Sequence, residues 1–168
     1  MSREGRAKRS AARLAAVQAL FQMEASGEDW RAVRDEFEAH RLAPAPGAGE
    51  AAGAPAADRS EDARPEADLA LFRMILEGAV SRQAQIDQAA EAAMKAGWPM
   101  RRLDPTLRAL FRAAGAELFD GTETPPKVVI SEFVEIAKAF FGEDDKAPGL
   151  ANAVLDRAAL AARPGAFA

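Results

Sequence analysis

The 168-residue chain has no cysteine and no tyrosine, and it has a single histidine, His40. The absence of cysteine excludes disulfides and thiolate metal sites. One histidine excludes a histidine-cluster metal site and most Ser-His or Cys-His catalysis, and His40 itself is expected on the surface. β-branched residues are also few, and much of the apolar content is alanine, which favours closely packed helices. The composition therefore predicts an all-α protein that holds no metal and no cofactor.

Long apolar runs and catalytic motifs are absent as well. No stretch approaches ~20 consecutive apolar residues, so no membrane-spanning helix is predicted. The basic start followed by LAAVQALF is similar to a secretory signal, but Gln18 interrupts the apolar run. There is no Walker-type phosphate loop and no dinucleotide glycine pattern. Carboxylate pairs such as Glu132 and Glu135 fit a solvated helix face. We therefore expect a non-enzymatic protein.

Positive charge is concentrated at the N-terminus. The net charge of the chain is -4, yet residues 1–13 contain five Arg or Lys and one Glu, which leaves -8 on the remaining residues. Arg6, Arg9 and Arg13 have i, i+3, i+7 spacing and border the apolar stripe of Leu14 and Val17. We therefore expect the first helix to overrun its core and to present these three guanidinium groups beside the body of the protein. On composition alone, this segment binds nucleic acid, solubilises the terminus, or binds a membrane or other anionic surface. A second basic group surrounds residues 101–112, namely Arg101, Arg102, Arg108 and Arg112.

Apolar periodicity predicts six or seven helices. The expected ranges are 6–27, 28–42, 67–97, 103–121, 124–142 and 150–163, with a bend near Gly78 and Ser81 in the longest. Glycines close several of them, Pro105 and Pro126 open two, and Ser26 with Asp29 resembles a capping box. The apolar positions, including Leu14, Leu69 and Phe140, are expected to face the core.

Residues 43–66 break the pattern. Of these 24 residues, 16 are Ala, Pro or Gly, and no apolar side chain is larger than Ala or Pro. Such a segment cannot bury enough surface to offset its ordering entropy, so we expect a flexible insert. We predict one helical domain over residues 1–168, with an N-terminal half (1–97) and a C-terminal half (98–168).

Four segments in the same order resemble the NusB family of transcription antitermination factors. RSAARLAAVQALFQME is similar to the family's Arg-rich first helix, and RRLDPTLRALFRAAGAELF to its fifth. PPKVVISEFVEIAKAF matches the pattern Pro-x-Lys-Val-x-Ile-x-Glu-x-x-Glu-x-Ala-Lys, and ANAVLDRAA matches the last helix. The chain departs from the family at the insert and at Ala116 and Pro126, where tyrosine is frequent. The loop before the last helix is about two residues longer.

The resemblance implies a seven-helix bundle of two small subdomains and a binding function without catalysis. Members pair with NusE, a small-subunit ribosomal protein, and bind boxA, a single-stranded element of nascent rRNA. They act indirectly on RNA polymerase with other Nus factors, in the bacterial cytoplasm, and some form homodimers. The implied NusE-facing residues are Phe21 and Glu117. The implied RNA contacts are Arg6, Lys8, Arg9 and Arg13 and, in the loop before the last helix and at the start of that helix, Asp145, Lys146 and Leu150. Lys127 is a further candidate by its position alone, because the start of a helix suits a phosphate.

One alternative of a different class stays open. A NusB-like domain also forms the N-terminal part of rRNA cytosine methyltransferases, although this chain has no cysteine of the kind that such an enzyme uses. The chain could in that case be a helical protein-interaction or rRNA-maturation module. RNA binding with and without NusE distinguishes the possibilities.

Overall fold

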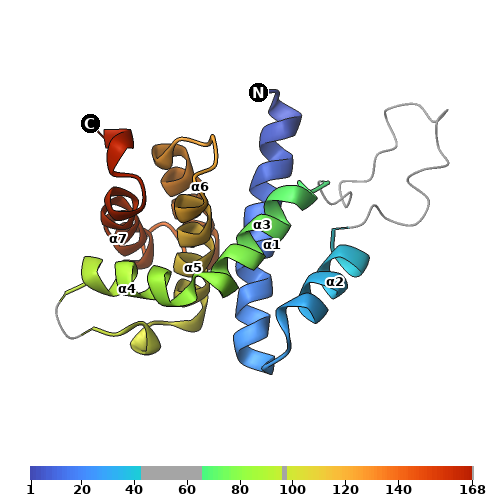
Figure 1. Cartoon of the computed structure of the whole chain (residues 1–168), viewed down its shortest axis with the longest axis horizontal. Helices are drawn as coiled ribbons and strands as arrows, with labels where there is room; N and C mark the ends of the chain where they lie inside the picture. Colours follow the sequence, from blue (N-terminus) through green and yellow to red (C-terminus); the bar gives the residue numbers. More distant parts are fainter. Residues whose placement is uncertain (43–65, 96–97, 168) are drawn as a thin grey trace.

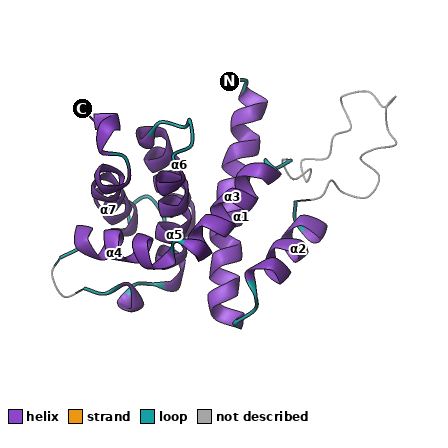
Figure 2. Cartoon of the chain, in the orientation of Figure 1, coloured by secondary structure: helices purple, strands orange, loops and turns teal. Residues whose placement is uncertain are grey.

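A computed structural model describes residues 1–42, 66–95 and 98–167. Within these ranges it contains seven α-helices, two short 3-10 turns and no strand (Figure 2), which confirms the all-α prediction. Apart from Glu66, the predicted insert lies outside the described residues. The elements are α1 (Arg3–Ser26), α2 (Trp30–His40), α3 (Leu69–Ser81), α4 (Gln83–Ala93), η2 (Met100–Arg102), α5 (Pro105–Asp120), α6 (Pro126–Phe141), α7 (Ala147–Ala162) and η3 (Pro164–Phe167).

Local sequence signals fix most helix ends. Gly27 and Gly121 follow α1 and α5 in the left-handed region, both with φ of 73°, which glycine adopts without steric cost. Asp104 caps α5 by accepting from the Thr106 amide at 2.8 Å. The N-cap of α2 is Asp29, which accepts from the Arg31 amide, so the predicted capping box is wrong. The last helix begins at residue 147 instead of 150.

The long helix predicted over residues 67–97 is two helices. Arg82, with φ of -113° and ψ of 17°, separates α3 from α4, one residue after the predicted bend at Ser81. Gly78 has a different role from the expected one, because a Cβ there would lie 3.3 Å from the Ala116 Cβ. Gly115 allows a still closer approach, since its Cβ would lie 2.4 Å from Ile86 Cγ2. Small residues therefore let α3 and α4 pack tightly on α5.

Helices α1, α5 and α6 run from top to bottom in Figure 1, across the longest axis of the molecule. Helix α5 is antiparallel to α1, because Arg108 near its start bonds Glu24 in the last turn of α1. Helix α6 runs in the same direction as α1, since Arg9 bonds Thr124 just before α6 and Phe140, near the end of α6, shares a groove with Phe21. The N-terminus and the α5–α6 loop therefore lie at one end of the molecule, and η2 lies at the other.

The buried side chains form one continuous cluster across the described helices. Phe37 of α2 and Phe72 of α3 stack with ring centroids 6.0 Å apart. Three residues expected in the core are substantially exposed instead: Leu14 by 37%, Leu69 by 37% and Phe140 by 43%. The division of the chain into two halves near residue 97 stays a prediction.

Candidate nucleic-acid interface

The basic stripe of α1 does not form one exposed surface. Arg6 is exposed, whereas Arg9 is 25% exposed and Arg13 is only 2% exposed. The prediction that α1 overruns the core and exposes all three arginines is therefore wrong. The stripe continues the apolar face of the helix, so the same rotation that buries Val17 also turns Arg13 toward α5.

Arg13 is held by a buried acid of α5. Its Nε and Nη2 donate to the two carboxylate oxygens of Glu117 at 2.8 and 2.7 Å. Burial lowers the pKa of Arg13, but the hydrogen bonds and charge of Glu117, with Glu132 and Asp68, raise it above its ordinary value. Glu117 is fully buried, so the prediction that it faces a protein partner is wrong. Its carboxylate neutralises Arg13 inside the protein.

Further polar contacts extend this pair into a network between α1, α3 and α6. Arg9 donates to the Thr124 hydroxyl at 2.7 Å and lies 3.7 Å from Asp68. Ser10 donates to Glu132 at 2.7 Å. The network was not predicted from the sequence, because its acids are distant in sequence from the arginines of α1. The spacing of Glu132 and Glu135 in particular resembled that of an ordinary solvated helix face.

Lys8 is engaged at the edge of the same network. Its ammonium lies 3.2 Å from Glu4 and 3.1 Å from Glu66, and the hydrogen bonds to Glu66 and then Glu4 raise the pKa of Lys8. The carbonyl of Lys8 also accepts from the Asp68 amide at 3.0 Å. The segment before α3 is thus fastened to α1.

The other predicted RNA contacts are exposed. Within the described ranges, Arg6, Lys127 and Lys146 have no acidic side chain within ion-pair distance, and Leu150 is 38% exposed. Lys127 lies in the first turn of α6, at the same end of the molecule as Arg6, where Met1 and Val128 line one hollow. Asp145, Lys146 and Leu150 lie beyond the other end of α6. Asp145, two residues before α7, accepts from the Ala147 amide at 2.8 Å.

Two arginines of the second basic group (residues 101–112) are paired with acids, and two are exposed. Arg108 bonds Glu24, and Arg112 bonds both Glu24 and Asp87. The hydrogen bond from Arg108 lowers the pKa of Glu24 despite the opposing effect of burial, and the charges of Arg108 and Arg112 add to it. Arg101 and Arg102 on η2 are exposed. Two of the four predicted cations are therefore neutralised within the fold.

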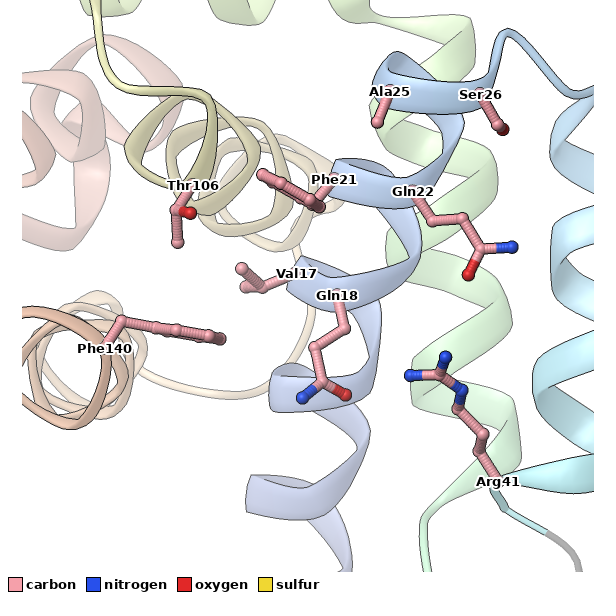
Figure 3. A pocket seen from close by; sticks show the side chains of 9 residues that line it. All are labelled: Val17, Gln18, Phe21, Gln22, Ala25, Ser26, Arg41, Thr106 and Phe140. Carbon is pink, nitrogen blue, oxygen red and sulfur yellow. The ribbon is translucent and has the colours of Figure 1, made fainter.

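An apolar groove of about 550 Å³ lies between α1, α5 and α6 (Figure 3). Val17 and Phe21 of α1 point toward Phe140 of α6 and Thr106 of α5, and Gln18 lies along the rim. Phe21 is 41% exposed, as expected for a residue that meets a partner. The groove was not predicted from the sequence, because Phe140 was assigned to the core.

Arg163, immediately after α7, closes the C-terminal end of α5. All five of its N–H donors are used: four reach the carbonyls of Glu117, Leu118, Thr122 and Thr124, and one reaches the Thr122 hydroxyl. A cation at a helix C-terminus also suits the partial negative charge there. This clamp fixes the loop that leads to Lys127.

The described residues offer neither a metal site nor a membrane-spanning helix. They contain no group of three or more His, Cys, Asp or Glu side chains arranged to hold a metal ion. None of their helices is long and apolar enough to cross a membrane.

Comparison with known proteins decides the family. The model of the NusB family matches residues 10–160. The chain belongs to the NusB family. It is 46% identical over 150 residues to the transcription antitermination protein NusB of Mesorhizobium japonicum, covering 89% of this chain and 87% of the relative. The corresponding protein of Agrobacterium fabrum is 43% identical over 156 residues, covering 93% and 86%.

Solved NusB structures share the fold. The T. maritima NusB structure superposes with a TM-score of 0.69 at 25% identity, over 95% of this chain and 96% of that one. The NusB of a complex of antitermination factors NusB and NusE with dsRNA superposes with a TM-score of 0.65 at 21% identity, over 90% and 96%. The NusB resemblance expected from the sequence is thereby confirmed.

Proposed function

We propose that the protein is an RNA-binding transcription antitermination factor that acts together with NusE on boxA in nascent rRNA. The observation that carries this proposal is its 43–46% identity, across most of the chain, to transcription antitermination proteins NusB. It works by binding, without catalysing a reaction, and acts in the bacterial cytoplasm. Its influence on RNA polymerase is indirect, through the other Nus factors.

The distribution of unpaired cations supports RNA binding. Arg6 on α1 and Lys127 at the start of α6 lie at one end of the molecule, and Lys146 lies beyond the other end of α6. Cations without an acidic neighbour are free to replace the counterions of RNA phosphates. In the first turn of α6 only the Lys127 amide suits a phosphate, because Pro126 has no N–H and the Val128 amide donates to the Pro125 carbonyl at 3.0 Å. Leu150 offers an apolar contact beside Lys146.

The groove that holds Phe21 supports a protein partner. Its walls are mainly apolar, and two aromatic side chains, Phe21 and Phe140, are each more than 40% exposed. Exposed aromatics in a concave surface are typical anchors of protein interfaces. The excess negative charge outside the N-terminal segment suits a basic ribosomal protein. A homodimer that covers the RNA-binding face would compete with RNA.

The test is a titration of single-stranded boxA RNA with the full chain, with and without NusE, against a scrambled RNA of equal length. We expect NusE to tighten binding of boxA more than binding of the scrambled strand. If the chain binds NusE normally but binds neither RNA, the proposed RNA-binding function is wrong and the chain is a protein-interaction module. Sedimentation of the chain alone tests for the homodimer.

A further inference from the structure

A turn at one end of the molecule carries an exposed aromatic ring among free cations. Trp98, just before η2, is 51% exposed. Lys95, Arg101 and Arg102 are exposed around it in the chain, and none has an acidic side chain within 4.0 Å among residues 1–42, 66–95 and 98–167. Neither the α1 cations nor the Phe21 groove includes these four residues. Together, Lys95, Trp98, Arg101 and Arg102 form the Trp98 patch.

The backbone beneath the Trp98 patch is held in place by its neighbours. Arg108 donates to the carbonyls of Met100, Arg101 and Leu103 at 3.2, 3.3 and 2.9 Å. The Met100 amide donates to the Glu91 carboxylate at 2.9 Å. The backbone of residues 100–103 is therefore held by groups other than the exposed side chains of the patch.

The acids closest in the chain do not neutralise the Trp98 patch. Glu91 is engaged by the Met100 amide, and Asp104 accepts from the Thr106 amide as the cap of α5. Glu24 and Asp87 are engaged by Arg108 and Arg112. The charge of Arg101 and Arg102 thus remains available to an anion from outside.

A second tryptophan shows by contrast what is particular to this patch. Trp30 also lies among arginines, but Arg31 and Arg34 cover its ring at 4.8 and 5.3 Å from the centroid. Asp29 lies 3.9 Å from Arg31, and Asp35 lies 2.8 Å from Arg34. Both the ring and the charges around Trp30 are therefore already engaged within the protein.

We infer that the Trp98 patch is a second contact for single-stranded RNA. An exposed indole offers a face on which an unpaired base stacks, and guanidinium groups bind the neighbouring phosphates. A basic ribosomal protein would be repelled by the three cations, so RNA is the favoured ligand. The inference rests on the proposed RNA-binding function and adds a location to it.

The two RNA contacts would be far apart. The bond between Arg108 and Glu24 fastens the patch to the last turn of α1. Glu24 lies about 27 Å along the helix from Arg6, at 1.5 Å per residue. One strand that reaches both would gain affinity from the second, intramolecular contact, whereas a strand too short to span them would not.

The test uses fluorescence of the full chain. The sequence has two tryptophans, so Trp30→Phe leaves Trp98 as the only tryptophan reporter. We expect single-stranded boxA RNA to quench it, because stacking places a base against the indole. In the chain with both tryptophans, Trp98→Ala should weaken binding of a long strand by about fivefold to a hundredfold. A short strand held at the Arg6 end should be unaffected.

Charge removal gives an independent readout. Arg101→Gln with Arg102→Gln should flatten the slope of log affinity against log salt by about 1.4, at roughly 0.7 per phosphate. The matched control, Arg31→Gln with Arg34→Gln, removes the same charge from the Trp30 cluster and should leave the slope unchanged.

Three outcomes would overturn the inference. If RNA binds and responds to Arg6→Gln, but neither Trp98 fluorescence nor the slope responds at the patch, the second contact is wrong and the proposed function stands. If Trp98 responds to NusE and not to RNA, the patch is a protein surface. If no RNA binds under any condition, the proposed function and the second contact are both wrong.

Discussion

Arg13 and Glu117 form a two-point ion pair between α1 and α5, with donor–acceptor distances of 2.8 and 2.7 Å and almost no solvent exposure. Removal of one partner leaves an uncompensated buried charge, which costs about 3–5 kcal/mol. We therefore expect Arg13→Met or Glu117→Leu to lower the free energy of unfolding by that amount. Urea unfolding measures the change.

The double variant Arg13→Met with Glu117→Leu separates the pair from the packing around it. Because it removes both charges together, it should recover a large part of the stability lost in either single variant. Arg6→Met, on the same helix but exposed, is the matched control and should change stability by under about 0.5 kcal/mol. Equal losses of unfolding free energy in Arg13→Met, Glu117→Leu and Arg6→Met would contradict the special role of the buried ion pair.

The exposed cations at the N-terminal end predict a change in salt dependence. Arg6→Gln with Lys127→Gln should flatten the slope of log RNA affinity against log salt by about 1.4, if each cation neutralises one phosphate of a single strand. Stability should stay almost unchanged, because both side chains are exposed and unpaired. A salt series of RNA titrations with NusE at saturation measures the slope. Unchanged slopes would place the RNA elsewhere.

The groove predicts a partner-specific defect. Phe21→Asp should weaken NusE binding by about 2 kcal/mol, roughly thirtyfold, because it puts a charge at an apolar anchor. The control is Leu160→Asp on α7, which removes an apolar residue outside the groove that is 50% exposed, against 41% for Phe21. Calorimetry with NusE distinguishes the two variants. An equal loss in both would show a general effect on folding.

Glu24 predicts a pH-dependent contribution to stability. The hydrogen bond from Arg108 and the charge of Arg108 lower the pKa of Glu24 in the folded protein. The stabilisation by Glu24 is therefore complete above the pKa of about 4.3 that a glutamate has in the unfolded chain, and it is lost as pH falls through the lower pKa of the folded state. Because 35% of the side chain is exposed, we expect Glu24→Gln to cost less than about 1 kcal/mol at pH 7.

Below pH 4 the difference in unfolding free energy between Glu24→Gln and the unaltered chain should shrink. Urea unfolding at pH 7 and at pH 3 measures it. A difference of the same size at both values would mean that packing, and not the charge of Glu24, is responsible.

The sequence predicted the helices well because their signals are local. Gly27, Asp104, Pro105 and Gly121 each act on the backbone within a few residues, and the structure confirms all four. The break at Arg82 was placed within one residue of Ser81, but as a bend in one helix. A local sequence pattern predicts where a helix is interrupted, but it does not predict which helix packs against it.

The site was predicted less well because its decisive contacts are long-range. The i, i+3, i+7 spacing of Arg6, Arg9 and Arg13 correctly placed them on one face, but Glu117, 104 residues from Arg13, determines which of them is buried. Phe140 fits the apolar stripe of α6 by spacing, yet it is 43% exposed and lines the groove with Val17 and Phe21 of α1. Tertiary contacts of this kind leave no local pattern.

Arg163 also sets an order of events in synthesis. A ribosome delivers α5, the loop and α6 before it delivers α7 and the arginine that follows. Until then, the carbonyls of Glu117, Leu118, Thr122 and Thr124 lack the guanidinium that satisfies them. The end of the molecule that carries Lys127 is thus completed only after α7 has been translated.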